Sequence, residues 1–272
     1  MNLVIKLSGK VLEQEGFRRA LSRQITSLVR APHRVLLVHG GGKQLSSLCE
    51  RLGIPVVQHE GRRVTDEPTL DAAKMVFSAA NRDLVASLNS CGARALGFAS
   101  FDAGLVRCRR RGPIPVRTAG SNGVSEKRLV DFGLVGEIES VDPRLIQDLW
   151  AANLLPVVSC LCATGDGRIL NINADTLAAR LATALRADRL VSVTDVEGLY
   201  LDNFRETVPR LTAGEVRMHL RSGAISGGMI PKMQTALKAL EQQIPMVQIV
   251  GGLSPNGLIR GIEGTAGTCI VP

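Results

Sequence analysis

Short apolar segments alternate with segments of helical periodicity, and this alternation constrains the fold more than any other feature of the sequence. The apolar segments are continuous, as in strands buried on both faces of a sheet. The predicted strands are Leu3–Leu7, Arg34–Val38, Arg94–Phe98, Leu154–Val158, Arg189–Val193 and Met246–Val250. Helical patterns fall at Phe17–Val29, Gly42–Leu52, Pro143–Ala152, Ala174–Leu185 and Pro231–Gln242. Strand, helix and strand in repetition predict an α/β protein with a mostly parallel sheet covered on both faces.

Two polar, turn-rich stretches interrupt this pattern, Ala103–Asp142 and Ala163–Asn171, and both are predicted to be hairpin insertions. The longest helical pattern runs from Glu67 to Cys91, with Thr65 or Asp66 as its cap and Pro68 in its first turn. This helix is predicted either as an ordinary core helix or as the support of a dimer interface. We expect two compactly joined lobes, residues 1–172 and 173–272.

Composition narrows the class of protein. Apolar residues make up 45% of the chain and charged residues 21%, which excludes a disordered or collagen-like chain. The formal net charge of +8 favours anionic partners. Aromatic residues are only 3%, too few for a stacking platform, so nucleic acid is not expected as a partner. The basic run Arg107–Arg111 lies beside Gly112-Pro113, and we interpret it as a solvated loop or hairpin tip rather than a polyanion site.

The sequence predicts a cytoplasmic protein with no membrane segment. No apolar run reaches the roughly 18 residues of a membrane span, and the N-terminus lacks the basic and apolar regions of a signal peptide. The six cysteines are scattered, as is usual for reduced thiols in the cytosol. Cys160 and Cys162 fall on one face of an apolar strand, so we predict buried thiols and no protein metal site.

In the first half of the chain, two turns after strands have the composition of anion sites. Gly40, Gly41 and Gly42 follow a strand and open a helix, where backbone amides attract an anion, although a structural tight turn is equally compatible. The spacing does not match a Walker A loop. Lys6 lies inside the first strand, just before Ser8-Gly9, and the apolar residues around it predict a central position for that strand. Ligands of open α/β sheets lie at the carboxyl ends of such strands, so Lys6 is a candidate for binding an anion.

Four further segments carry candidate polar groups. Asn171 and Asn173 alternate before Asp175, and either Asn173 or Asp175 can cap the helix that follows. Lys232 falls in a first helical turn, which is unfavourable for a cation unless an anion shares the site. The loop Asp195–Tyr200 follows a strand and suits a nucleotide. Arg63 could direct its guanidinium at a carboxylate, or form an ordinary surface salt bridge.

Taken together, these segments resemble the amino-acid kinase family over nearly the whole chain. The resemblance rests on seven motifs in order: KLSG (Lys6–Gly9), HGGG (His39–Gly42), GRRVTD (Gly61–Asp66), NINAD (Asn171–Asp175), TDVEGLY (Thr194–Tyr200), GGMIPK (Gly227–Lys232) and GTCI (Gly267–Ile270). GRRVTD, NINAD and GGMIPK are the most specific of them. They are most similar to the branch that phosphorylates N-acetyl-L-glutamate in arginine biosynthesis.

The resemblance implies a role for each matching residue. Lys6 and Lys232 would stabilise the transferring phosphoryl group, with Asp175 holding both lysines in place. The remaining matches are a phosphate loop (Gly9, Gly40), an acyl-amino-acid site (Gly41, Gly42, Arg63, Asn171) and a nucleotide site (Asp195, Val196, Glu197, Gly198, Leu199, Tyr200, Ala224, Ile225, Ser226). The implied fold is a three-layer α/β/α sandwich, with the acyl amino acid on the N-terminal lobe and ATP on the C-terminal lobe.

The implied reaction transfers a phosphoryl group from ATP to the side-chain carboxylate of N-acetyl-L-glutamate, giving N-acetyl-L-glutamyl 5-phosphate. Mg²⁺ would be carried on the ATP phosphates, with few or no protein ligands. A homodimer is expected, and because the chain begins at its first strand, it resembles the arginine-insensitive members. Two alternatives stay open: a kinase for an aminoadipate-type substrate of lysine biosynthesis, since one methylene contributes only about 1–3 kcal/mol, and a non-catalytic amino-acid or nucleotide sensor. The joint presence of Lys6, Asp175 and Lys232 argues against the sensor.

Overall fold

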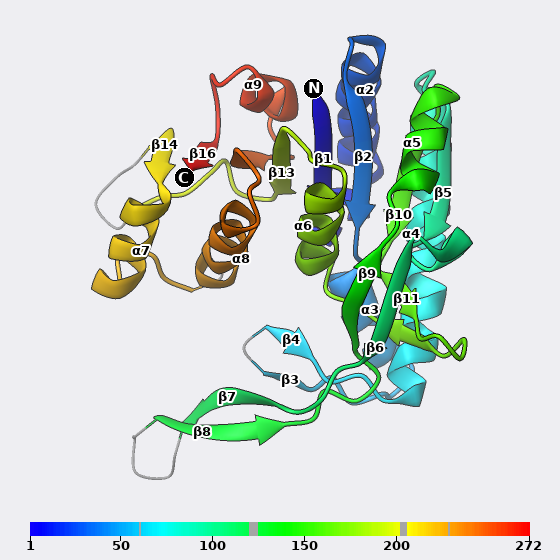
Figure 1. Cartoon of the computed structure of the whole chain (residues 1–272), viewed down its shortest axis with the longest axis vertical. Helices are drawn as coiled ribbons and strands as arrows, with labels where there is room; N and C mark the ends of the chain where they lie inside the picture. The colour runs from blue at the N-terminus through cyan, green and yellow to red at the C-terminus, as the bar shows by residue number, and fades with distance from the viewer. Residues whose placement is uncertain (60, 120–124, 202–205, 228) are drawn as a thin grey trace.

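A central eight-stranded sheet organises the molecule in the computed structural model, which describes residues 1–59, 61–119, 125–201, 206–227 and 229–272 (Figure 1). Its strand order is β14-β16-β15-β13-β1-β2-β10-β5. The bounds are β1 Asn2–Leu7, β2 Arg34–His39, β5 Ala95–Ala99, β10 Leu155–Ser159, β13 Arg189–Thr194, β14 Arg210–Thr212, β15 Val247–Gly251 and β16 Thr268–Val271. All strands from β15 to β5 are parallel, and β16 runs antiparallel to β15.

Helices cover both faces of this sheet and form the predicted three-layer α/β/α sandwich. Their bounds are α1 Gly9–Glu13, α2 Glu15–Arg30, α3 Gly42–Arg51, α4 Glu67–Ser90, α5 Arg144–Ala151, α6 Ala174–Ala184, α7 Ala213–Ser222, α8 Met229–Glu241 and α9 Gly257–Ile262, with a 3-10 turn at Asp102–Gly104. In β1, Leu3, Ile5 and Leu7 belong to the core under α2 and α9, whereas Val4 belongs to the core under α6 and α8. Because side chains alternate along a strand, Lys6 shares the face of Val4.

The six predicted strands are confirmed, each to within one residue at either end. The long helix is confirmed as α4, and Asp66 is its cap: the side chain accepts a hydrogen bond of 3.0 Å from the Thr69 backbone N–H. The helix of Lys232 is confirmed as α8, whereas Gly228 before it lies outside the described residues. Buried aliphatic runs were therefore sufficient to locate the layers.

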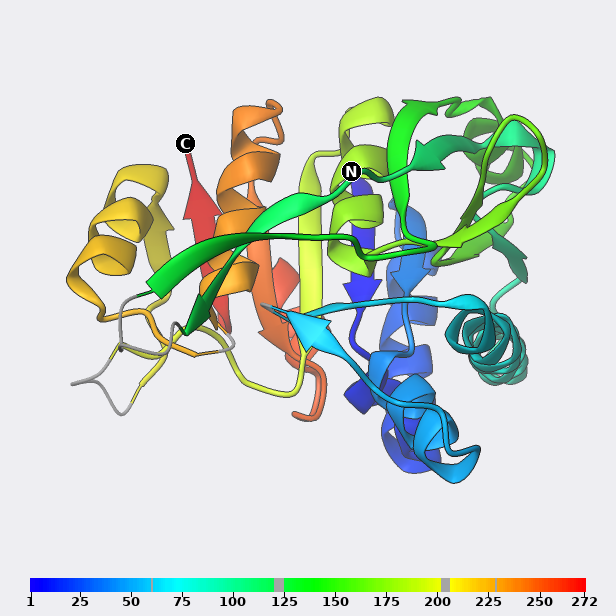
Figure 2. The same ribbon diagram turned by 90° about the horizontal axis from the view of Figure 1, so that it is seen from below.

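Both predicted insertions are hairpins. A second sheet, β12-β11-β6-β9, comprises β6 Val106–Arg110, β9 Gly136–Val141, β11 Leu161–Ala163 and β12 Ile169–Asn171. Two hairpins pair β3 Gln58–His59 with β4 Arg62–Arg63, and β7 Ile114–Ala119 with β8 Ser125–Val130. Both hairpins lie beyond the carboxyl ends of β1 and β2 and extend toward the half of the molecule that holds α7 and α8 (Figures 1 and 2).

The interpretation of Arg107–Arg111 as a loop or hairpin tip was wrong, because its first four residues belong to β6, which pairs with β9. Val106 and Cys108 are buried while the arginines between and after them are exposed, which is the alternation of a half-buried strand. Arg109 pairs with Glu137 at 2.9 Å, and Arg110 with Asp131 at 2.9 Å. Gly112-Pro113 thus marks the end of this strand.

Among the helices that the structure describes, none is both long enough and apolar enough to cross a lipid bilayer.

Candidate active site

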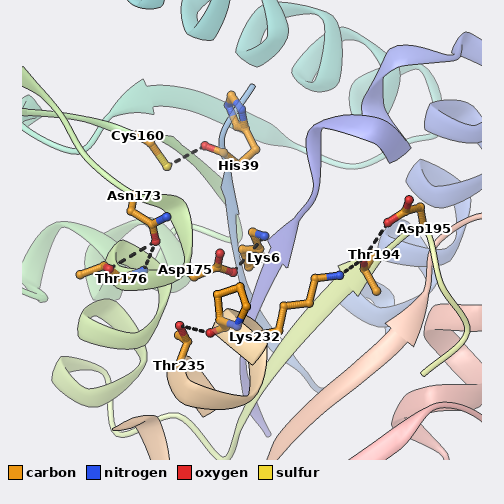
Figure 3. A network of polar contacts seen from close by, with 11 residues as sticks. Lys6, His39, Cys160, Asn173, Asp175, Thr176, Thr194, Asp195, Lys232 and Thr235 are labelled. Carbon is orange, nitrogen blue, oxygen red and sulfur yellow. Dashed lines mark hydrogen bonds and ion pairs between the residues drawn. The ribbon is translucent and has the colours of Figure 1, made fainter. Parts of the chain in front are cut away.

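Lys6 and Asp175 form an ion pair at the carboxyl end of β1. The Lys6 Nζ lies 2.9 Å from Asp175 Oδ1, and the two side chains are 12% and 31% exposed (Figure 3). Asn173 caps α6 by accepting a hydrogen bond of 2.9 Å from the Thr176 N–H, which confirms the capping prediction. The cap sets Asp175 in the first turn of α6, where the helix dipole favours a carboxylate. The local structure of α6 therefore presents an anion to the lysine of β1.

Lys232 reaches the same region from α8. Together with Lys6 and Asp175 it lines a small cavity of about 20 Å³. Its Nζ donates a hydrogen bond of 2.6 Å to Thr194 Oγ1 at the end of β13, and Asp175 pairs with Lys6. Burial, followed by repulsion from Lys6, lowers the pKa of Lys232 below its ordinary value. Two ammonium groups near one carboxylate leave this point suited to a further anion.

Beside this cluster a larger pocket of about 790 Å³ opens between the ends of β1 and β13 and the start of α8. Of the predicted nucleotide residues, Asp195, Val196, Tyr200 and Ser226 line it. The other five lie outside its lining: Glu197, Gly198, Leu199, Ala224 and Ile225. Leu199 and Ile225 are buried core residues. The structure therefore brings four of the nine predicted nucleotide residues to the pocket and places two of the others, Leu199 and Ile225, in the core.

The glycine turn after β2 is anchored by a buried histidine. His39 Nδ1 lies 2.9 Å from the Gly40 carbonyl oxygen, and its Nε2 lies 2.9 Å from Asn81 Nδ2 of α4. Burial lowers the pKa of His39, so the ring is neutral and accepts from Asn81 while donating to Gly40. A Cβ on Gly41 would come 3.0 Å from Phe77 Cδ1, which explains a glycine there. The sequence analysis missed Asn81, whose partner lies far away in the chain.

Arg63 lies at the end of β4 and is directed at the same glycine turn. One guanidinium nitrogen, Nη2, donates to the Gly42 carbonyl oxygen at 3.0 Å and to Ser46 Oγ at 2.6 Å. The other, Nη1, is buried without a hydrogen-bond partner in the described part of the chain. A buried donor of this kind needs an acceptor, and a carboxylate fits an arginine. Asn171 lies nearby in the fold through its hydrogen bond of 3.1 Å to Thr65 Oγ1.

Several lining residues were not predicted. They are Lys10, Lys43, Thr194, Leu201 and Met229. Gln44 was also missed; its Nε2 donates a hydrogen bond of 3.0 Å to the Gly9 carbonyl oxygen and links the turn after β1 to α3. For Lys10 a signal was available, because it follows Gly9 at the strand end that also carries Lys6.

The site does not supply a ready set of metal ligands. Among the described residues no group of three histidine, cysteine, aspartate or glutamate side chains could hold an ion. Asp175 is paired with Lys6 and Asp195 with Lys10. The residues present therefore fit a divalent cation that brings its own phosphate and water ligands, as Mg²⁺ commonly does.

Comparison with known proteins defines the class. The model of the amino acid kinase family matches residues 1–250. The chain therefore belongs to the amino acid kinase family, and the predicted resemblance and fold class are confirmed.

Within this family, curated relatives named acetylglutamate kinase match over nearly the full chain. The relative from Myxococcus xanthus is 42% identical over 98% of this chain and 88% of its own length. The relative from Sorangium cellulosum is 42% identical over 99% of this chain and 94% of its own. A solved structure of N-acetylglutamate synthase from Neisseria gonorrhoeae shares the fold, with a TM-score of 0.83 at 23% identity. The alignment covers 99% of this chain and 61% of that longer one.

Proposed function

We propose that this protein transfers the γ-phosphoryl group of ATP to the side-chain carboxylate of N-acetyl-L-glutamate, giving N-acetyl-L-glutamyl 5-phosphate in arginine biosynthesis. The observation that carries the proposal is the convergence of Lys6, Asp175 and Lys232 beside an open pocket at the strand ends. The acetylglutamate kinases among its relatives support the substrate, and the aminoadipate-type and sensor alternatives are not favoured.

Lys6 and Lys232 supply the positive charge that this reaction needs. A carboxylate oxygen attacks the γ-phosphorus, the bond to the bridging oxygen breaks, and ADP leaves. The nucleophile is already ionised, so no general base is needed, but two anions must be brought together. Lys6 and Lys232 offset the charge on the transferring group, and Asp175 orients Lys6. We therefore propose a catalytic role for all three residues.

The acceptor binds beside the glycine turn. Arg63, through its unpartnered Nη1, binds a carboxylate of the acyl amino acid, and Asn171 lies on the same side of the site. The amides of Gly41 and Gly42 contact the acceptor, and those of Gly9 and Gly40 the phosphoryl group. Residues 1–172 form the acceptor lobe.

The donor binds in the larger pocket, against residues of lobe 173–272. Asp195, Val196, Tyr200 and Ser226 contact the nucleotide, while Glu197, Gly198, Leu199, Ala224 and Ile225 support their loops. Mg²⁺ carried on the ATP phosphates supplies further neutralisation of charge.

We also propose a cytoplasmic homodimer. All six cysteines are free, as in a reducing compartment. Helix α4 is 24 residues long and exposes Met75 to 61%, which suits a contact with a second copy.

The proposal is tested by incubating the purified protein with ATP and Mg²⁺ and trapping acyl phosphate with hydroxylamine. N-acetyl-L-glutamate, N-acetylaminoadipate, L-glutamate and a blank without acceptor are compared. We expect hydroxamate with N-acetyl-L-glutamate well above the others. Preference for N-acetylaminoadipate would overturn the substrate, and absence of product with every acceptor would overturn the activity.

A further inference from the structure

Two lysines that line the large pocket, Lys10 and Lys43, take no part in the mechanism described so far, and Lys10 is the one with a charged partner in the pocket wall. Lys10 lies in the first turn of α1, directly after Gly9, and lines the large pocket. Its side chain is 44% exposed, and its Nζ pairs with Asp195 Oδ2. The charged group of Lys10 is thus fixed at the pocket wall although much of the side chain is open to solvent.

The partners of Lys10 connect it to the catalytic cluster. Thr194 Oγ1 donates to Asp195 Oδ1 at 3.1 Å and accepts from Lys232 Nζ at 2.6 Å (Figure 3). A continuous polar chain therefore runs from Lys232 through Thr194 and Asp195 to Lys10. The charge of Lys10 also contributes to lowering the pKa of Lys232, after burial and Lys6. The two ammonium groups are thus close enough to influence each other across the pocket.

The balance of charge around the pocket favours a polyanion. Its lining includes Lys10, Lys43 and Lys232 but a single carboxylate, Asp195. Lys6 and Asp175 beside it neutralise each other. A nucleoside triphosphate carries more negative charge than Lys6 and Lys232 alone can offset, and ammonium groups bind phosphate as point charges.

The position of Lys10 indicates whether it would contact the transferred phosphoryl group or the phosphates that remain on the nucleotide. On the proposed function, the transferred group would lie by Lys6 and Lys232, and the nucleoside by Val196, Tyr200 and Ser226, which line the two pockets. Lys10 and its partner Asp195 line only the large pocket, Lys6 lines only the inner cavity, and Lys232 lines both. A group there meets the part of the polyphosphate that stays with the nucleoside.

We infer that Lys10 is a donor-binding residue that contacts the β-phosphate of the nucleotide, the phosphate that ADP has and AMP lacks. This inference rests on the proposed function, since it assumes an adenine nucleotide in the large pocket. Asp195 orients the Lys10 ammonium group before the nucleotide arrives, so less side-chain freedom is lost on binding. The role of Lys10 is to bind the donor rather than to stabilise the transferred group.

The test is a titration calorimetry comparison of ADP and AMP, both with Mg²⁺, on the wild type and Lys10→Met. A charge-assisted hydrogen bond predicts that Lys10→Met weakens ADP binding about tenfold or more. AMP binding should change less than about twofold, and Lys10→Arg, which keeps the charge, should recover most of the ADP affinity. Unchanged AMP binding also reports that the variant is folded.

A matched control separates this contact from a general loss of positive charge. Lys74 pairs with Asp71 at 2.8 Å and is 38% exposed, but it lies on α4 outside the pocket lining. Lys74→Met should leave both affinities unchanged. Equal weakening of ADP and AMP by Lys10→Met, or no weakening of either, would overturn the assignment of Lys10. Failure of the wild type to bind ADP would instead overturn the proposed function.

Discussion

Lys232 combines burial, a first-turn position and a neighbouring cation, which are three unfavourable circumstances for an ammonium group. On the proposed function, a bound phosphoryl group would offset all three, which would explain a lysine at this position. The sequence identified Lys232, Lys6 and Asp175 as candidates because each is unusual for its local structure. Lys6 is a charged residue inside an apolar strand, Lys232 is a cation near a helix N-terminus, and Asp175 is one polar residue more than a helix cap requires. The sequence analysis missed Lys10 and Asn81 because their partners, Asp195 and His39, become neighbours only through the sheet order.

We predict that Lys232→Met lowers kcat roughly 10²–10³-fold, because it removes a preorganised electrostatic contact to the transition state. The KM for ATP should change far less. The control is Lys238→Met, which removes an exposed lysine from the last turn of the same helix. Steady-state kinetics with N-acetyl-L-glutamate measures both constants, and wild-type turnover in folded Lys232→Met would refute the catalytic role.

The lowered pKa of Lys232 predicts a pH dependence. The charged form is active, so kcat/KM for ATP should fall as the pH rises through a pKa below the ordinary lysine value. Bound phosphate favours the charged form, so the fall in kcat should come at higher pH. In the variant Lys232→Arg the guanidinium stays charged at alkaline pH. Its remaining activity should therefore not fall as the pH rises. An identical alkaline fall in Lys232→Arg would assign it to another group.

At the scale of elements, apolar periodicity located the central strands and the long helices, but it was less informative for the short elements around them. The strand β6 was missed as a strand because Gly112-Pro113 outweighed the buried alternation of Val106 and Cys108. Helix α7 was not predicted, although Thr212 and Glu215 form a capping box at its start. Short amphipathic elements are fixed by caps and partners, which a search for long apolar runs does not detect.

Helix α4 offers a test of this view, because it carries the Asn81 that anchors the glycine turn. Removing its cap with Asp66→Ala should lower the free energy of unfolding by about 1 kcal/mol. Asp71→Ala, which removes an exposed pair with Lys74 on the same helix, should lower it by about 0.5 kcal/mol or less. Urea denaturation compares the two variants. Equal losses would mean that the cap contributes no more than a surface ion pair.

At the scale of the whole molecule, the sheet order brings together residues from both halves of the chain. Parallel pairing of β1 with β13 aligns Lys6 with Ser192, two residues before Thr194. On the proposed function, the acceptor side of the site would come from β1, β2 and β4, and the donor side from β13 and α8. The sequence predicted an α/β sheet with polar residues at its strand ends, whereas the contacts between those residues could be determined only from the structure.

The proposed dimer belongs to this scale. A charge at Met75, exposed on α4, should disrupt a contact made through that helix, so Met75→Glu should convert a dimer into a monomer. Met218→Glu is the control, because Met218 is 56% exposed on α7. Light scattering after size-exclusion chromatography measures the mass of each. A monomeric wild type, or dimers of all three proteins, would contradict an interface on α4.

The central claim is that a carboxylate oxygen of the acceptor attacks the γ-phosphorus of ATP. The most direct measurement uses N-acetyl-L-glutamate labelled with ¹⁸O in its side-chain carboxylate and traps the product with hydroxylamine, which attacks the acyl carbon. The account predicts that the released phosphate carries one ¹⁸O atom from the acceptor, as read by ³¹P NMR. Phosphate without ¹⁸O, formed together with hydroxamate, would contradict the account.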